Sequence, residues 1–240
     1  NVRNSVEKGD YSAAKFLLLQ YKRLAGGGKW FMEPFVAERL SDETDIAADS
    51  VCMHYIYDDI NLKRPYVEGR VYMGEHFDWL FNPRESGDPN YTVEWTYSCV
   101  SRINFLNKLV VAYKKTGNEK YLWRWFMYDF AKDNPLTVKP IWRTLDTAIR
   151  IRTWLNTYLT FRNSARFTAE DNTLYLKLIY EHAEHLKNTL LRDFERTGNH
   201  VTTECAALFT MGCVFQEFAK AEEWRTVAMN RYVDEIKKVV

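Results

Sequence analysis

The sequence predicts an all-α protein built from antiparallel helical hairpins, and three observations support this prediction. Glycine and proline, which interrupt helices, number only 10 and 6 among 240 residues. From residue 93 onward, apolar residues recur at the spacing of an amphipathic helix. The breaks between these predicted helices are about three to nine residues long, and connections this short place neighbouring helices antiparallel.

Residues 1–92 are expected to hold two helices and a long irregular connection, within the same domain as the rest of the chain. The first helix covers about residues 11–24, with Asp10 as its N-cap, and a triple glycine ends it. The second covers about residues 45–57. Residues 58–92 are rich in proline, glycine and aromatic residues, so we expect an ordered, functional connection with a short extended piece.

Residues 93–240 are expected to form the helical-hairpin core. Thr168 is a helix cap, and Thr-Gly-Asn interrupts the pattern at 116–118 and again at 197–199. Two matching breaks hint at a repeated hairpin unit. The expected helices cover about residues 93–115, 119–133, 144–162, 169–192, 201–218 and 221–240.

Composition and charge narrow the classes of partner. A formal net charge of +1 gives no overall attraction to nucleic acid or to a membrane surface. These 240 residues contain no apolar run of about 18 residues for a membrane span, and we expect no signal peptide among them. The chain begins without Met and stops inside a predicted helix, so we expect it to be cut from a longer protein.

The four cysteines are expected to be free, buried thiols. Cys205 and Cys213 lie eight residues apart on one predicted helix, roughly 12 Å, which is too far for a disulfide. For metal, His182 and His185 form only an HxxH without a neighbouring carboxylate or thiolate, and His182 falls on the apolar stripe. No metal site is therefore predicted.

The first candidate site is the break at residues 197–200. Gly198 is expected to end one helix and Asn199 to cap the next, so that an amide and the imidazole of His200 lie at a helix N-terminus, where anions are favoured. Glu204 follows on the same helical face. The simpler alternative is an ordinary Asn cap beside a solvated histidine.

The second candidate site surrounds Trp142 and Arg143, with Arg150 expected on the same face as Arg143. An indole can stack on a sugar ring, and a guanidinium can bind a carboxylate or sulfate through two hydrogen bonds. The alternative is a tryptophan packing anchor with solvated arginines.

The third candidate group lies on the irregular connection and just after it. It consists of Trp79, Asn82 and Trp95, whose aromatic rings and amide suit sugar binding on a loop. The alternative is that both tryptophans are core or loop anchors. Carboxylates for glycoside hydrolysis could come from Glu94, Asp146 or Glu204, but no spacing selects a pair.

These pieces, taken in order, resemble one known family over nearly the whole chain. The chain resembles the N-terminal helical domain of the heparinase II/III family, and heparinase III-type polysaccharide lyases in particular. The residues that carry this resemblance are Gly9-Asp10, Asp78-Trp79, Asn82-Pro83, Glu94-Trp95, Ala112-Tyr113, Thr116 to Tyr121, Trp142 to Asp146, Arg150, Asn199-His200, Glu204, Leu208, Gly212 and Trp224.

The resemblance implies an incomplete (α/α) toroid followed by a C-terminal β-sandwich that this chain lacks. It implies lyase chemistry on uronic-acid polysaccharides, with no metal or organic cofactor. Asn199 would bind and neutralise the substrate carboxylate, and His200 matches a histidine implicated in related alginate-type lyases. A tyrosine beyond Val240 and a histidine of the β-sandwich would complete the acid and base.

The sequence therefore suggests the substrate-binding helical domain of a lyase that cleaves a heparan sulfate-like glycosaminoglycan by β-elimination. From the resemblance alone, we expect a periplasmic or secreted protein whose partners are an acidic polysaccharide and its own β-sandwich. The alternatives are an alginate or other uronate lyase, a toroidal glycoside hydrolase, and a non-catalytic carbohydrate-binding or interaction domain. The polysaccharide, the oligomeric state and the activity of this chain alone stay open.

Overall fold

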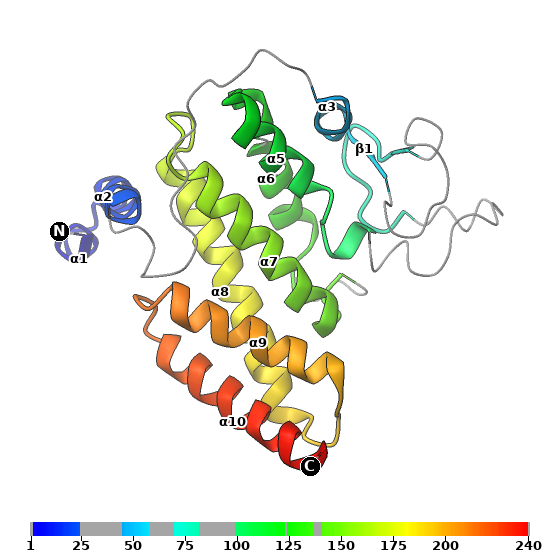
Figure 1. The fold of residues 1–240 in the computed structure, drawn as a ribbon. Helices are drawn as coiled ribbons and strands as arrows, with labels where there is room; N and C mark the ends of the chain where they lie inside the picture. Colours follow the sequence, from blue (N-terminus) through cyan, green and yellow to red (C-terminus); the bar gives the residue numbers. More distant parts are fainter. Residues whose placement is uncertain are drawn as a thin grey trace. The chain divides into compact units, whose positions relative to one another are not determined.

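The computed structural model describes residues 2–24, 45–57, 70–81, 99–122, 124–136 and 141–239, and these residues are mainly helical (Figure 1). The prediction of an all-α fold is confirmed. In chain order the elements are α1 (Val2–Glu7), α2 (Tyr11–Leu24), α3 (Ile46–Cys52), β1 (Tyr55–Ile56), β2 (Val71–Tyr72), α5 (Leu106–Thr116), the 3-10 helix η3 (Glu119–Tyr121), α6 (Arg124–Asp133), α7 (Thr144–Phe161), α8 (Ala169–Arg192), α9 (Asn199–Val214) and α10 (Ala221–Val239).

Two helices begin where their caps predict. The Asp10 carboxylate accepts the Ala13 N–H at 3.0 Å, at the start of α2. At the start of α8, the Thr168 hydroxyl accepts the Asp171 N–H at 3.2 Å, and the Asp171 carboxylate accepts the Thr168 N–H at 2.8 Å. This reciprocal capping box satisfies backbone donors that a helix cannot satisfy itself. Local chemistry therefore determines both starts.

The helix expected over residues 45–57 ends early, at Cys52. His54 has a φ of 65°, and after it the chain becomes extended as β1, which pairs antiparallel with β2. The rings of Tyr55 and Tyr72 face each other across this pair, with centroids 5.1 Å apart. Cross-strand aromatic contacts stabilise such a ladder, so a tertiary partner overrides helix formation here.

The helix expected over residues 93–115 is interrupted before α5, which starts at Leu106. Residues 99–101 make one wide helical turn, and Ile103 has a φ of 50°, which breaks the helical path before α5. Val100, Ile103 and Phe105 are buried, so this irregular segment is part of the core. The earlier part, residues 93–98, lies outside the described residues.

The two Thr-Gly-Asn breaks have different structures. Gly117 ends α5 in the left-handed region, with a φ of 64°, and Asn118 then caps η3 by accepting the Lys120 N–H at 3.0 Å. At the second break, α8 has already ended at Arg192, and Gly198 directly precedes α9 with a φ of 95°. The same tripeptide is thus a helix C-cap once and a helix start once.

The chain groups into two compact units. One comprises residues 38–157 and the other residues 1–37 with 158–240, so the ends of the chain share a unit. The first unit has an aromatic core with ring centroids 4.6 to 6.2 Å apart along its chain of contacts, made by Phe77, Trp79, Phe105, Phe126, Phe130 and Trp154.

The second unit contains a clear helical hairpin. Helices α9 and α10 run antiparallel side by side, drawn in orange and red in Figure 1, and α8 contacts both. Helix α2 is held by Arg23, which donates to the carbonyl oxygens of Arg162, Ser164 and Phe167 at 2.8 to 2.9 Å. The hairpin packing expected from short connections is therefore present in this unit.

All four cysteines are free; Cys99 and Cys205 are buried, whereas Cys52 and Cys213 are half-buried. No helix in the described ranges combines the length and the apolar character that a membrane crossing requires.

Candidate functional site

Asn199 lies at the first position of α9 and is exposed to solvent. The expectation that Asn199 caps this helix is wrong, because the N-cap is Gly198, which has no side chain to bind the free backbone N–H groups. Gly198 has φ 95° and ψ −163°, a backbone region that essentially only glycine adopts. The Asn199 side-chain amide therefore does not cap the helix. Its position depends on the backbone of the turn that precedes it. His200 follows and is half-buried.

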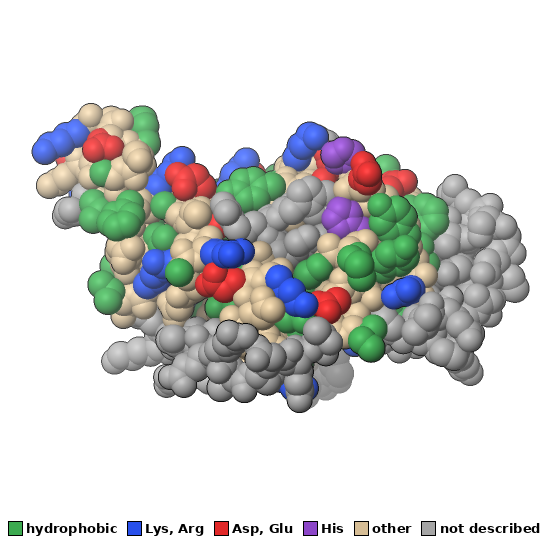
Figure 2. Space-filling model, turned by 90° about the horizontal axis from the view of Figure 1, so that it is seen from above, with side chains coloured by type: hydrophobic (Ala, Val, Ile, Leu, Met, Phe, Trp, Pro, Cys, Tyr) green, Lys and Arg blue, Asp and Glu red, His purple; other side chains and the backbone are tan. Residues whose placement is uncertain are grey.

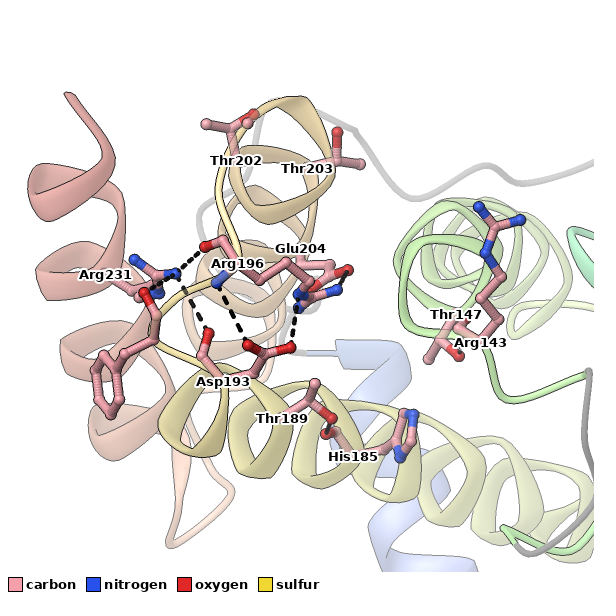
Figure 3. A network of polar contacts seen from close by, with 12 residues as sticks. Arg143, Thr147, His185, Thr189, Asp193, Arg196, Thr202, Thr203, Glu204 and Arg231 are labelled. Carbon is pink, nitrogen blue, oxygen red and sulfur yellow. Dashed lines mark hydrogen bonds and ion pairs between the residues drawn. The ribbon is translucent and has the colours of Figure 1, made fainter. Parts of the chain in front are cut away.

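Glu204 is fully buried and binds Arg196, in the turn between α8 and α9 (Figure 3). The two terminal nitrogens of Arg196 donate to the two carboxylate oxygens of Glu204, at 2.9 and 2.5 Å. The Arg196 Nε is also 3.4 Å from the Asp193 carboxylate. Glu204, predicted to bind substrate, therefore has both oxygens engaged by the protein and supports the turn before Asn199.

A second pair of charges, from α10, holds the same turn from another direction. Arg231 is buried, and one of its terminal nitrogens donates to the carbonyl oxygens of Asp193, Phe194 and Arg196. Its other terminal nitrogen bonds to Glu235 at 3.0 Å. Figure 3 shows Arg231 pointing into the turn. Neither α10 residue was predicted from the sequence, because nothing local relates them to a turn more than 30 residues earlier.

Glu235 connects this pair directly to the residue before Asn199. Its Oε2 accepts the Gly198 N–H at 2.8 Å, and its Oε1 lies 3.1 Å from the Lys238 ammonium. Burial raises the pKa of the carboxyl, but the Gly198 N–H and the nearby cations outweigh it, and the net pKa of Glu235 is lowered. The carboxylate is thus ionised near neutral pH and able to hold the turn.

Arg150 was expected to share an exposed face with Arg143, and this prediction is wrong. It is fully buried, and one terminal nitrogen donates to the carbonyl oxygens of Ser101 and Ile141 at 2.5 and 2.9 Å. Burial lowers the pKa of Arg150 to about 9, against the opposing effect of Asp146. The physical reason for the difference is that Arg150 points inward from α7 and donates to carbonyl groups of two separate segments, at Ser101 and Ile141.

Trp142 is also buried, rather than exposed for stacking on a sugar. Its indole N–H donates to the Asn134 carbonyl oxygen at 3.0 Å, and the Arg150 guanidinium lies over its ring, 5.2 Å from the centroid. The packing alternative for Trp142 therefore matches the structure. A buried indole fills a large volume and usually satisfies its one donor, as this one does.

Arg143 keeps the exposed position that a substrate contact needs. Its side chain is 40% exposed, and one terminal nitrogen lies 3.6 Å from the buried Asp146 carboxylate. Arg102 binds the other oxygen of Asp146 at 2.7 Å. Arg102 was not singled out from the sequence, since it falls in a segment that looked like ordinary helix. Arg102 and Arg143 thus place two partly exposed guanidinium groups beside the buried Asp146 carboxylate.

The structure describes only one residue of the third predicted group, Trp79. Trp79 belongs to the aromatic core and donates its indole N–H to Asp129 at 3.0 Å, so it is a packing residue in this structure. Asn82 and Trp95 lie outside the described residues.

The described surface carries mixed charge. On the face in Figure 2, basic and acidic side chains lie interspersed with hydrophobic ones. Within the described ranges, no group of three or more His, Cys, Asp or Glu side chains is arranged to hold a metal ion. His182, considered above for metal, is fully buried, with Nδ1 2.6 Å from the Leu178 carbonyl oxygen of its own helix.

Comparison with known proteins identifies relatives over most of the chain. A heparin-sulfate lyase of Pedobacter heparinus is 28% identical over 174 residues, covering 70% of this chain and 25% of the relative. A heparin-sulfate lyase of Bacteroides thetaiotaomicron is 24% identical over 251 residues, covering 100% of this chain and 34% of the relative. The chain thus spans at most about a third of these relatives' length.

Solved structures show the same fold. The crystal structure of a heparan sulfate lyase from Pedobacter heparinus matches 99% of this chain with a TM-score of 0.74 at 23% identity, and the match covers 37% of that protein. A crystal structure of heparinase III matches 99% of the chain with a TM-score of 0.78 at 21% identity. The family model described as the heparinase II/III N-terminus matches residues 1–240, and the chain therefore belongs to the heparinase II/III family.

Proposed function

We propose that this chain is the substrate-binding helical domain of a lyase that cleaves heparan sulfate-like, uronic acid-containing polysaccharide by β-elimination. The relatives named heparin-sulfate lyase support the reaction class and the substrate. The observation that carries the proposal is the exposed Asn199 amide at the start of α9, on a turn held by two ion pairs whose carboxylates are buried. The rest of the lyase, including a β-sandwich, is expected in the full-length protein.

The chemistry needs a neutral donor at the substrate carboxylate. When a base removes the proton from C5 of the uronate, negative charge develops on the adjacent carboxylate; the C4–O bond then breaks, and a C4=C5 double bond forms as the leaving oxygen takes a proton. Donors aimed at the developing charge stabilise the transition state. An Asn amide at a helix N-terminus supplies such donors, and the helix dipole acts in the same direction.

The proposal gives the other predicted residues different roles. Arg143 is the substrate-binding arginine, because it remains partly exposed, and His200 is retained as a second catalytic candidate beside Asn199. Trp142, Arg150 and Glu204 act from the interior by holding the segments that carry exposed residues. The base and acid are expected outside these 240 residues, and the incomplete toroid and the periplasmic or secreted location remain predictions.

The decisive experiment replaces Asn199 by Ala in the full-length protein and measures the ultraviolet absorbance of new unsaturated uronate ends. We expect turnover on heparan sulfate to fall about 100- to 1000-fold, the usual cost of losing such a donor. Asn230→Ala is the matched control, because Asn230 is an exposed helical asparagine of α10 and not one of the α10 residues that bind the turn. A near-normal rate for Asn199→Ala would show that the assignment is wrong.

A panel of polymers separates the remaining alternatives. Heparan sulfate, chondroitin sulfate, hyaluronan and alginate are each offered to this chain and to the full-length protein. Signal on heparan sulfate from the full-length protein alone supports the proposal. Signal on alginate alone would identify a different uronate lyase, and cleavage without unsaturated ends would indicate a hydrolase. If the 240-residue chain alone produced unsaturated ends, the expectation that the base and the acid lie outside these residues would be wrong.

A further inference from the structure

The turn before Asn199 contains a point of weakness at Gly198. Glycine loses more conformational freedom on folding than any other residue, and a glycine with φ 95° and ψ −163° has no side chain to hold it there. A methyl group added at Gly198 would meet nothing within 4 Å, so packing does not restrain it either. The direction in which the chain enters α9 therefore depends on what holds the Gly198 backbone.

The Gly198 N–H is held by a carboxylate that is itself fixed. Glu235 Oε2 accepts this N–H at 2.8 Å. The other oxygen of Glu235 lies 3.0 Å from the Arg231 guanidinium and 3.1 Å from the Lys238 ammonium. The Glu235 side chain is only 4% exposed, so its rotamer is restricted by packing as well as by the two cations. One oxygen anchors the carboxylate to α10, and the other holds the turn.

Arg231 extends the same contact over the rest of the turn. It donates to the carbonyl oxygens of Asp193 and Phe194 at 3.4 and 3.3 Å and to that of Arg196. One face of α10 thus binds the turn along its length, ending at the N–H next to Asn199. Because Gly198 directly precedes Asn199, its backbone conformation affects the path of the chain into the residue that carries the amide.

We propose that Glu235 is a positioning residue that aligns the Asn199 amide with the substrate carboxylate by holding the Gly198 N–H. This rests on the proposed role of Asn199. Misplacement of a reacting group by about 1 Å can cost about 100-fold in rate, so loss of this anchor is expected to lower kcat far more than it changes substrate binding.

Two substitutions at Glu235 isolate the hydrogen bond from the charge. Glu235→Gln and Glu235→Met both remove the negative charge beside Arg231 and keep nearly the same volume, but only glutamine retains an oxygen that can accept the Gly198 N–H. We expect Glu235→Met to lower kcat on heparan sulfate about 10- to 100-fold with KM changed less than about threefold, and Glu235→Gln to restore most of that loss.

A double-mutant cycle tests whether Glu235 acts through Asn199. If it does, Glu235→Met lowers kcat in the wild-type background but changes it less than about threefold when Asn199 is already Ala. Glu223→Gln, at another ion-paired acid of α10 that does not contact the turn, is the control and should leave kcat unchanged. Thermal unfolding of each variant establishes that it is folded at the assay temperature.

The outcomes distinguish this proposal from the proposed function. An equal loss in both Asn199 backgrounds, or a wild-type kcat for Glu235→Met, overturns the positioning role while leaving Asn199 in place. A near-normal rate for Asn199→Ala overturns the proposed function, and the positioning role with it. If Glu235→Met does not fold, Glu235→Asp replaces it: the shorter side chain keeps the charge but withdraws from Gly198, and the same loss of kcat is expected.

Discussion

Arg196 and Glu204 form a two-point ion pair, with nitrogen–oxygen distances of 2.9 and 2.5 Å, that joins the turn before α9 to the second turn of that helix. The Glu204 side chain is fully buried, whereas that of Arg196 is 27% exposed. Two parallel hydrogen bonds restrict the orientation of both groups as well as the distance between them. The exposed end of α9 is therefore fixed relative to the helix body.

Removing the cation of this pair should destabilise the protein. Arg196→Met leaves a buried carboxylate without its partner, and breaking a buried pair costs about 3–5 kcal/mol, so we expect about 2–3 kcal/mol here because Arg196 is partly exposed. Chemical denaturation of the variant measures this change in the free energy of unfolding. Arg192→Met, at an exposed arginine that ends α8, is the control. A change for Arg196→Met no larger than that of the control would contradict the expectation.

Arg143 and Arg150 should separate substrate binding from stability. We expect Arg150→Met to lower the free energy of unfolding by about 2–4 kcal/mol, because two buried carbonyl oxygens lose their donor. Arg143→Met should change the free energy of unfolding by less than about 1 kcal/mol, because Arg143 is partly exposed and Arg102 still binds the Asp146 carboxylate, yet raise KM for the acidic polysaccharide. Urea denaturation and the ultraviolet assay give the two quantities. Equal effects of both substitutions on unfolding would contradict the assignment of Arg150 to the interior.

Gly212 allows the close approach of α9 and α10. A Cβ atom there would lie 2.6 Å from the Ala221 carbonyl oxygen and 2.7 Å from the Arg225 Cγ. Alanine is ordinarily better than glycine inside a helix by about 1 kcal/mol. We nevertheless expect Gly212→Ala to lower the free energy of unfolding by about 1–3 kcal/mol, because the backbone at Ala221 cannot move aside cheaply. A stabilised variant in thermal and chemical denaturation would show that the two helices can separate without cost.

The buried thiol of Cys205 should make stability fall at alkaline pH. Burial raises the pKa of Cys205 to about 12, whereas the thiol of an unfolded chain has a pKa of about 8.5. Above that lower value the unfolded state loses a proton that the folded state keeps, so stability falls as pH rises toward 12. Between pH 8 and 10 we expect wild type to lose about 2 kcal/mol more than Cys205→Ala.

Denaturation at both pH values measures this difference. Cys213→Ala is the matched control on the same helix, because Cys213 is half-buried and burial raises its pKa as well. The control should remove a smaller part of the alkaline loss. If wild type and Cys205→Ala lose the same stability over this range, the Cys205 thiol ionises as readily in the folded state as in the unfolded one.

Helix boundaries were predictable where the residues that determine them are close in sequence. Asp10 and Thr168 each bind a backbone N–H three residues later, and both helix starts were predicted correctly. The end of α3 and the start of α5 were not, because the segments beside them contact β2 and Arg150, which lie about 16 and 50 residues away in sequence. Helical periodicity alone continued through both positions.

The candidate residues divide in the same way. The sequence located the start of α9, and the structure leaves Asn199 exposed there. It could not separate exposed Arg143 from buried Arg150, because both residue types suit a sugar acid and only burial distinguishes them. Trp79 and Trp142 proved to be packing residues for the same reason, since a tryptophan near a loop satisfies either role.

By itself, the sequence determined the all-α class, most helix ranges and the resemblance to heparinase II/III proteins, because helical period, caps and short motifs are local properties. Only the tertiary structure decided which arginines are exposed, that the two ends of the chain form one unit, and that Arg231 and Glu235 hold the turn before Asn199. Those facts depend on contacts between distant residues, and no local pattern specifies which buried partner a charged side chain will find.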